Sequence, residues 1–164
     1  MKPRRDSKHR PEREKPEFEQ KLVDLARVTR VTGGGKRMSF RALVVLGDKN
    51  GRVGYGVEKG KDVTLAMTKA GEQAKKRMLK LNFKDSVPHE IRHKFGAARI
   101  LLKPAPSGTG IKAGGPMRIM LDMAGIQDVV GKMVGTSKNK INYIICTYEA
   151  LKILNNSSSR PTSR

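Results

Sequence analysis

The sequence predicts an α+β fold built from two small domains. Three observations support this prediction: alternating strand patterns, an amphipathic helix after the first strands, and a different order of elements beyond residues 82–86. A chain of 164 residues has room for one domain or two small ones, at roughly 100 to 200 residues per domain. We expect domains at 17–81 and 87–155, flanked by a disordered basic tail (1–16) and a flexible tail (156–164).

The first domain is expected to contain three antiparallel strands and one helix. Residues 22–31 fit either a strand or a short helix, and the flexible basic tip that follows favours a long strand entering a hairpin. Apolar residues then alternate from 39 to 57 around Asp48-Lys49-Asn50-Gly51, a hairpin signal in which Asn50-Gly51 suits a type I′ turn. Gly54 and Gly56 leave one strand face without side chains, so another backbone can approach it closely.

Asp62 is predicted to cap the helix of this domain. Its apolar stripe is formed by Val63, Ala66, Met67, Ala70, Ala74, Met78 and Leu81. The other positions include Lys69, Lys75, Lys76, Arg77 and Lys80. This basic face is either simply solvated or an RNA contact, and the sequence does not decide between the two.

The second domain is predicted to begin with a strand over 87–95, which Gly96 ends, and to continue with a strand over 99–103. A long glycine-rich loop leads to a helix that starts at Pro116 and ends at Gly125. A short strand over 126–134 and a last helix, capped by Asn139 and running through Leu154, complete an α+β unit.

The charge of the chain predicts a polyanionic partner. Lys and Arg number 35 against 15 Asp and Glu, which gives a net charge of +20, and the basic excess is spread over tails and body alike. No apolar run approaches the roughly 18 residues of a membrane-spanning helix, and no secretory signal follows Met1. A single cysteine, Cys146, cannot form an internal disulfide, which fits a reducing, cytoplasmic location.

Three short motifs suggest other chemistry. His89-Glu90-Ile91-Arg92-His93 matches the zinc-peptidase pattern, but that pattern requires a helix and the alternation here favours a strand. The segment 108–113 matches a dinucleotide fingerprint, although its glycines fit backbone contacts to RNA phosphate better. The segment 56–62 differs from a P-loop in spacing and is discarded. We therefore expect no catalytic residues, no metal and no cofactor.

Six segments in order along the chain resemble the bacterial small-subunit ribosomal protein five family. They are Arg-Val-Thr-Arg at 27–30, Gly-Gly-Lys at 34–36, Ser-Phe-Arg-Ala-Leu-Val-Val at 39–45, Gly-Asp-Lys-Asn-Gly-Arg-Val-Gly-Tyr-Gly at 47–56, Leu-Lys-Pro-Ala at 102–105 and Gly-Thr-Gly-Ile-Lys-Ala-Gly-Gly at 108–115. The resemblance covers about residues 17–154. One departure is at the hairpin tip, where Gly33 and Lys36 occupy the Lys and Arg positions of the usual Lys-Gly-Gly-Arg, and Arg37 is added.

The resemblance implies an N-terminal domain like a double-stranded-RNA-binding domain, with a three-stranded antiparallel sheet plus helix, and a C-terminal α+β domain. It implies a structural, non-enzymatic role as a monomer in the small ribosomal subunit. There the chain would bind 16S ribosomal RNA, contact proteins four and eight, brace the head against the body and contribute to translational accuracy. The implied RNA-binding residues are Arg27, Arg30, Gly34, Gly35, Lys36, Arg37, Phe40, Arg41, Arg52, Tyr55, Lys59, Lys61, Gly108, Gly110, Lys112, Gly114 and Gly115.

Two alternative functions remain at this point. A zinc hydrolase would use His89, Glu90 and His93, and zinc analysis of the purified protein would test it. A DNA architectural protein would also suit the dispersed charge, and a comparison of ribosomal RNA with duplex DNA at matched salt would separate the two nucleic acids.

Overall fold

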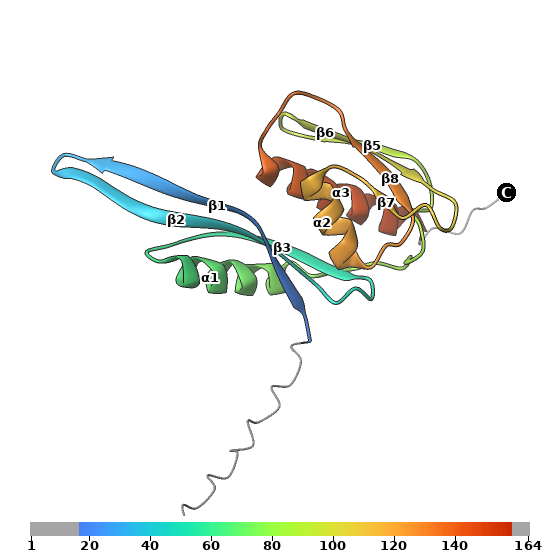
Figure 1. Ribbon diagram of the computed structural model, residues 1–164, viewed down its shortest axis with the longest axis horizontal. Coiled ribbons are helices and arrows are strands. Elements are labelled where there is room, and N and C mark those ends of the chain that lie inside the picture. The colour runs from blue at the N-terminus through green and yellow to red at the C-terminus, as the bar shows by residue number, and fades with distance from the viewer. Residues whose placement is uncertain (1–16, 159–164) are drawn as a thin grey trace, which may run out of the picture.

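The computed structural model describes residues 17–158 and confirms the predicted two-domain α+β fold (Figure 1). The first domain contains β1 (Glu19–Thr32), β2 (Gly35–Gly47), β3 (Arg52–Gly60), α1 (Val63–Lys76) and β4 (Leu79–Lys80). The second contains β5 (Ile91–Phe95), β6 (Ala98–Pro104), β7 (Ile111–Lys112), α2 (Gly115–Ala124), β8 (Val129–Met133) and α3 (Lys140–Ser158). Residues 1–16 and 159–164, which cover the predicted N-terminal tail and most of the C-terminal one, lie outside the described residues.

Each domain has one four-stranded sheet. The first sheet has the order β1-β2-β3-β4 and is antiparallel throughout, so the short β4 adds one strand to the three predicted. The second sheet has the order β5-β6-β8-β7, and its last pair is parallel. The strand β7 lies inside the glycine-rich loop, where its two residues gave no alternating pattern to detect.

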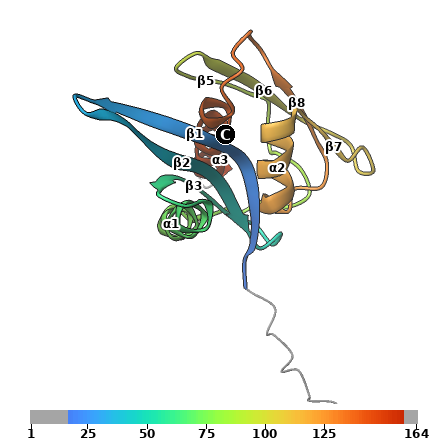
Figure 2. The same cartoon turned by 60° about the vertical axis from the view of Figure 1, so that its left-hand side comes forward.

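The elements stack in four layers, because α2 and α3 lie between the two sheets and α1 covers the far face of the first sheet (Figures 1 and 2). Alternate residues of β2 enter different cores: Ala42 and Val44 pack with α1, whereas Leu43 and Val45 join the core formed with α2 and α3. The part of the first sheet next to the body is therefore buried on both faces, and the two domains share a hydrophobic core.

The glycines of β3 allow the backbone of α1 to lie directly on the sheet, as predicted for Gly54 and Gly56. A Cβ atom at Gly54 would overlap the carbonyl oxygen of Ala74, and one at Gly56 would overlap that of Ala70. The predicted cap is also confirmed, since the Asp62 carboxylate accepts a hydrogen bond from the Val63 amide at 2.8 Å. The helix is shorter than its apolar stripe predicted, because the chain leaves it after Lys76 to form β4 beside β3.

The turn between β2 and β3 is not the predicted type I′ turn. Positive φ angles occur at Lys49 (58°) and Gly51 (96°) but not at Asn50, and a type I′ turn needs them at both central residues. The Asp48 carboxylate organises the turn instead, because it accepts hydrogen bonds from the amides of Asn50 (2.7 Å) and Arg52 (3.0 Å).

Three boundaries in the second domain also differ from the prediction. The strand expected from Val87 begins only at Ile91, although Val87 is buried in the core. The strand expected over 126–134 is limited to β8. The last helix begins after Asn139, as predicted, but continues to Ser158 and so includes the start of the predicted flexible tail. The Asn155 side chain helps to hold this end in place, since it accepts a hydrogen bond from the Asn82 amide at 2.9 Å.

The β1–β2 hairpin extends well beyond the body of the molecule (Figure 1). Its strands of 14 and 13 residues pair from Glu19 and Gly47 at the base to Thr32 and Gly35 at the tip. The outer half of the hairpin has no helix or sheet against it, so both of its faces are open to solvent (Figures 1 and 2).

Candidate nucleic-acid interface

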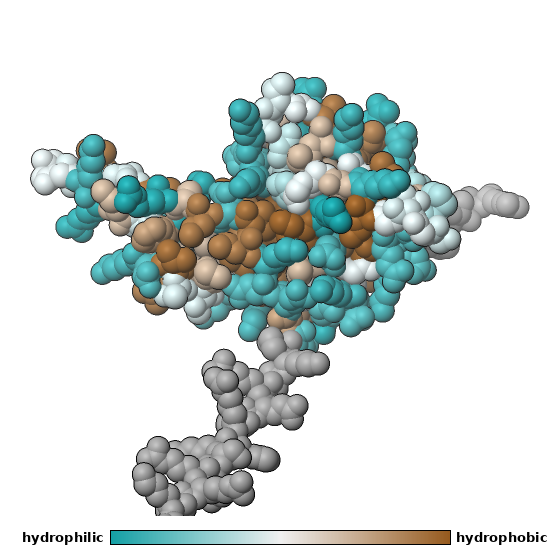
Figure 3. Space-filling view, viewed as in Figure 1, coloured by the Kyte–Doolittle hydropathy of each residue, from teal (hydrophilic) through white to brown (hydrophobic). Residues whose placement is uncertain are grey.

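The hairpin carries the densest group of predicted RNA-binding residues. Arg27, Arg30, Lys36 and Arg37 are exposed, and Arg41 is half-buried. No carboxylate among residues 17–158 lies within 4.0 Å of any of these five cations. Their charge is therefore available to an external anion. Figure 3 shows hydrophilic side chains along the projecting hairpin and an apolar belt closer to the body.

The strand register divides these cations between the two faces of the hairpin. Arg30 is directly opposite Arg37, and Arg41 is directly opposite Lys59 of β3. Because side chains alternate along a strand, these four cations share one face, whereas Arg27 and Lys36 belong to the other. Like charges directly opposite each other destabilise a sheet, so a bound anion would relieve this repulsion.

The tip of the hairpin exposes its backbone. A Cβ atom at Gly34 or Gly35 would meet no atom within 4 Å, and Gly35 has a φ of 138°, a conformation that other residues rarely adopt. Phe40, also predicted as an RNA contact, is half-buried and packs against the core beneath α1. Lys59 and Lys61 are exposed at the end of β3, where the chain turns into α1.

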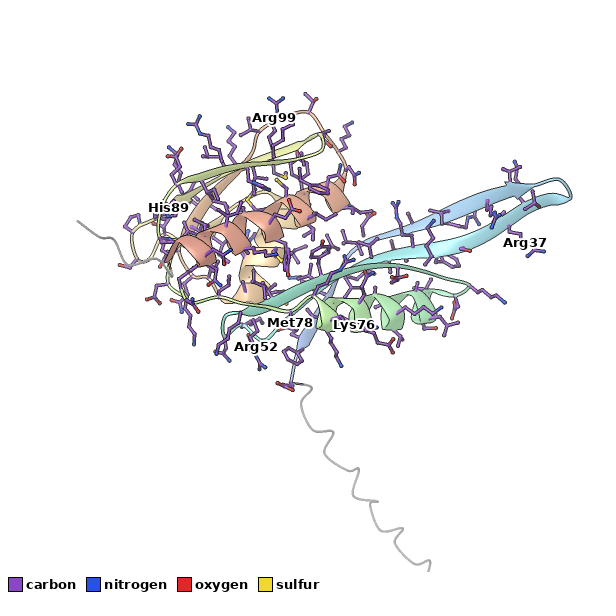
Figure 4. The ribbon with its side chains drawn as sticks, turned by 180° about the vertical axis from the view of Figure 1, so that it is seen from behind. Arg37, Arg52, Lys76, Met78, His89 and Arg99 are labelled. Carbon is purple, nitrogen blue, oxygen red and sulfur yellow. The ribbon has the colours of Figure 1, made fainter. Side chains whose placement is uncertain are left out.

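Arg52 and Tyr55 have contacts within the chain that the sequence did not predict. Arg52 forms ion pairs with Asp48 (2.6 Å) and Glu17 (3.0 Å), and its guanidinium lies over the Phe18 ring at 4.7 Å. These carboxylates raise the pKa of Arg52 through hydrogen bonds, first from Asp48 and then from Glu17. Tyr55 is only 8% exposed and lies between the two domains. Figure 4 shows Arg52 far from Arg37 at the hairpin tip, so Arg52 and Tyr55 do not belong to the hairpin surface.

The glycine-rich loop forms a second candidate site, on the opposite side of the molecule from the hairpin tip (Figure 1). Gly108 and Gly110 have φ angles of 87° and 71°, which favour glycine, and no atom lies within 4 Å of a Cβ built on either. Lys112 is exposed on β7. The loop ends at Gly114, the N-cap of α2, and at Gly115, the first residue of the helix. A Cβ at Gly115 would meet no atom within 4 Å, but one at Gly114 would overlap the Met133 side chain, so Gly114 is less open than predicted.

Asp128 holds this loop in place and was not predicted from the sequence. Its side chain is buried, at 8% exposure, and accepts a hydrogen bond from the Gly110 amide at 2.8 Å. The Ser86 hydroxyl similarly accepts one from the Ala105 amide at 3.2 Å. An acidic residue inside an otherwise apolar strand segment was the one available indication, but its partner depends on the tertiary fold.

The sequence interpretation also missed a group of cations on the outer face of the second sheet. It consists of Arg92, Lys94, Arg99, Lys103 and Lys132, all exposed. Glu90 neutralises two of them, since it forms ion pairs with Lys103 (3.1 Å) and Arg92 (3.3 Å), and hydrogen bonding from Lys103 lowers its pKa. The exposed cations Lys69, Lys75 and Lys76 of α1 fit both solvation and RNA contact, whereas Arg77, which follows the helix, has its guanidinium 5.3 Å from the centre of the Tyr55 ring.

The zinc-peptidase pattern does not form a metal site of the kind that it predicts. His93 lies on β5, not on a helix, and its Nε2 atom is 3.0 Å from the Glu149 carboxylate. Glu90 is occupied by Lys103 and Arg92. In the described part of the chain, no three His, Cys, Asp or Glu side chains are grouped closely enough to hold a metal ion. The same residues include no helix that is long and apolar enough to span a membrane.

The open basic hairpin and the exposed glycine-rich loop suit contact with RNA phosphate. Comparison with known proteins places the chain in the class of small-subunit ribosomal proteins. Residues 18–82 match the family model for the N-terminal domain of ribosomal protein S5, and residues 93–160 match the model for its C-terminal domain. The chain therefore belongs to the ribosomal protein S5 family, which is structural and not enzymatic in class.

Curated relatives agree with these family models. The chain is 49% identical over 142 residues to the small ribosomal subunit protein uS5 of Paramagnetospirillum magneticum, covering 85% of this chain and 67% of the relative. It is 46% identical over 150 residues to the uS5 protein of a Ruegeria species, covering 90% and 80%. The uS5 protein of Phenylobacterium zucineum is 45% identical over 151 residues, covering 91% and 77%.

Proposed function

We propose that this chain binds 16S ribosomal RNA through the hairpin and the glycine-rich loop, and that it thereby braces the head of the small subunit against the body. The observation that carries the proposal is the hairpin, which projects five cations without internal carboxylate partners on a chain of the S5 family. Each phosphate that a cation neutralises releases counterions, which favours binding.

The hairpin and the glycine-rich loop would bind RNA phosphate through different chemical groups. The hairpin offers guanidinium groups, which bind phosphate with two parallel hydrogen bonds. The glycine-rich loop offers backbone without covering side chains at Gly108, Gly110 and Gly115, and Gly115 lies at the start of α2, where amide groups favour an anion. In both places the ligand is the RNA backbone, and few aromatic side chains are available for base stacking.

The proposal extends to the setting of the protein in the cell. We propose a cytoplasmic protein that is present as one copy in each small subunit, contacts proteins four and eight there, and contributes to translational accuracy through its bracing role. Lys94, Arg99 and Lys132, the cations on the outer face of the second sheet that Glu90 does not pair, remain available to protein neighbours.

Sedimentation tests the proposal directly. A lysate is separated on a sucrose gradient, and the protein is located against the small subunits before and after a wash at raised salt. We expect it to sediment with the small subunit and to resist moderate salt. A protein that stays at the top of the gradient would contradict the proposed function.

A second measurement separates ribosomal RNA from DNA as the ligand. The purified chain is titrated with 16S ribosomal RNA and with duplex DNA at the same salt concentration, because unspecific phosphate binding depends on salt for both. We expect tighter binding to the ribosomal RNA. Equal affinity for duplex DNA would favour an architectural DNA-binding role instead.

A further inference from the structure

The contacts between the two domains are made by backbone as well as by side chains. The Lys49 amide donates to the carbonyl of Met123 at 3.2 Å, and the Gly51 amide donates to that of Ala124 at 2.9 Å. These bonds fasten the β2–β3 turn to the end of α2. A backbone contact of this kind cannot be released by a change of side-chain rotamer.

A second group of contacts fastens β3 and the end of α1 to α3. The rings of Tyr55 and Tyr148 meet edge to face, with centroids 4.9 Å apart. The Tyr148 hydroxyl donates to the Arg77 carbonyl at 3.1 Å, and the Arg77 guanidinium lies 5.3 Å from the centre of the Tyr55 ring. Burial raises the pKa of Tyr148, so its hydroxyl keeps the proton that it donates.

A third group fastens β1 to both helices of the second domain. Lys140, the first residue of α3, forms an ion pair with Asp24 at 2.9 Å, and Lys21 approaches Asp122 of α2 at 3.7 Å. The contacts thus start from β1, β3 and the β2–β3 turn, and they reach both α2 and α3. Because they are spread over the interface, no single segment is left to act as a hinge.

The backbones of the two domains approach each other closely at Gly47. The three atoms nearest to a Cβ built on Gly47 all belong to Met123, and two of them are backbone atoms. Gly125 of the second domain lies equally close to the first domain, because a Cβ built on it would overlap the carbonyl of Lys49. A methyl group at Gly47 would therefore meet the second domain first and push the two domains apart.

We propose that the chain is a rigid strut that holds the hairpin and the glycine-rich loop at a fixed separation. Gly47 and Tyr148 are the positioning residues that keep the two domains rigidly connected. One folded ribosomal RNA can then occupy both ends of the strut at once. This inference rests on the proposed function. The two ends lie on opposite sides of the molecule (Figure 1). When the first end is bound, a rigid connection presents the second at a high effective concentration, whereas a loose one spreads it over many positions.

The experiment combines a distance measurement with an affinity measurement on the full chain. Fluorophores are attached to cysteines introduced at Thr32, in the hairpin tip, and Ser107, in the loop, while the buried Cys146 stays unlabelled. Single-molecule energy transfer then reports the distribution of distances between the ends. Unlabelled protein is titrated with 16S ribosomal RNA and with a short RNA duplex that can occupy only one end.

We expect one narrow distance distribution for the unchanged protein and a broader one for Gly47→Ala. The substitution should weaken binding to 16S ribosomal RNA by about tenfold or more, with little change for the short duplex. Gly71→Ala is the matched control, because Gly71 is a glycine of α1 whose Cβ would make only an ordinary contact, 3.4 Å from the Gln20 side chain. It should change neither measurement.

A second variant keeps the test decisive if Gly47→Ala does not fold, as judged by circular dichroism. Tyr148→Leu retains apolar volume but removes the ring contact and the hydroxyl, and it should broaden the distances and weaken binding in the same way. A broadened distribution with unchanged affinity for 16S ribosomal RNA would overturn the strut, and so would unchanged distances in the folded variants. Failure of the unchanged protein to bind 16S ribosomal RNA would instead overturn the proposed function.

Discussion

Replacing Gly56 by alanine tests how closely α1 lies on the first sheet. The added methyl group would overlap the carbonyl oxygen of Ala70 and approach the amide nitrogen of Ala74. Both are backbone atoms inside a helix, so neither can move without the helix. The Ala66, Ala70 and Ala74 side chains of this helix are fully buried, and a displaced helix would also lose part of their contacts.

The size of the effect follows from two opposing contributions. Overfilling a well-packed core costs about 1–3 kcal/mol, and the rigid obstacle here favours the upper end. Alanine also restricts the unfolded chain, which returns about 0.4–1 kcal/mol because Gly56 has no positive φ. We expect a net loss of about 2–2.6 kcal/mol, which lowers the melting temperature by about 4–10 °C in a chain of this size.

Thermal and urea unfolding followed by circular dichroism measure this loss. Gly71→Ala is again the control, since it replaces a helical glycine in a position with room for a methyl group, and it should stabilise the protein by up to about 1 kcal/mol. If Gly56→Ala melted with the unchanged protein, the close contact between α1 and β3 would not exist in solution.

Four further outcomes are expected. Arg37→Gln should reduce the slope of log affinity for 16S ribosomal RNA against log salt by about 0.7–0.9. Arg52→Gln should leave that slope nearly unchanged and should lower the melting temperature. If fluorescence titrations gave equal slope changes for the two variants, the distinction between these arginines would be refuted. Burial raises the pKa of Asp48, but hydrogen bonds from Arg52 and Asn50 and the charge of Arg52 outweigh it and hold that pKa below its ordinary value. The stability that this interaction contributes is present at neutral pH and is lost as the pH falls below about 4 and through the pKa of Asp48 in the folded protein. Asp48→Asn should therefore be less stable than the unchanged protein at pH 7, and the difference in stability should shrink in acid. A difference in urea midpoints that stayed constant with pH would contradict this. Burial raises the pKa of Cys146, so a colourimetric thiol reagent should react with it only after denaturant is added, and rapid reaction of the native protein would show that the core is open. Metal analysis of the purified chain should find no stoichiometric zinc, because His93 is paired with Glu149; one zinc per chain would revive the hydrolase interpretation.

Local sequence patterns were sufficient to predict the helices and strands that are defined by contacts between residues close in the chain. The alternation over 39–57 predicted two strands correctly, and Asp62 and Asn139 marked the starts of two helices. The bare face at Gly54 and Gly56 predicted close backbone approach. Patterns of this kind extend over only a few residues. For this reason the predicted ends of α1 and α3 and the predicted type of the β2–β3 turn were wrong.

The candidate interface was predictable in part. Exposed basic residues in the hairpin and the glycines of the loop were identified from the resemblance, and the structure places them on open surfaces except for Gly114, which the Met133 side chain covers. Arg52 and Tyr55 could not be told apart from these, because their partners Glu17 and Tyr148 are distant in sequence or belong to the other domain. Asp128 was missed for the same reason, since its partner Gly110 lies in another element.

The sequence by itself determined the α+β class, the order of most elements, the strong positive charge and the resemblance to one ribosomal family, because composition and short-range periodicity are properties of the chain alone. Only the tertiary structure decided that the inner part of the first sheet is buried on both faces, and that the two domains share a core. It also decided that one face carries Arg30, Arg37, Arg41 and Lys59. The physical reason is that burial, ion pairing and strand register arise from residues far apart in the chain, and these meet only when the layers have been assembled.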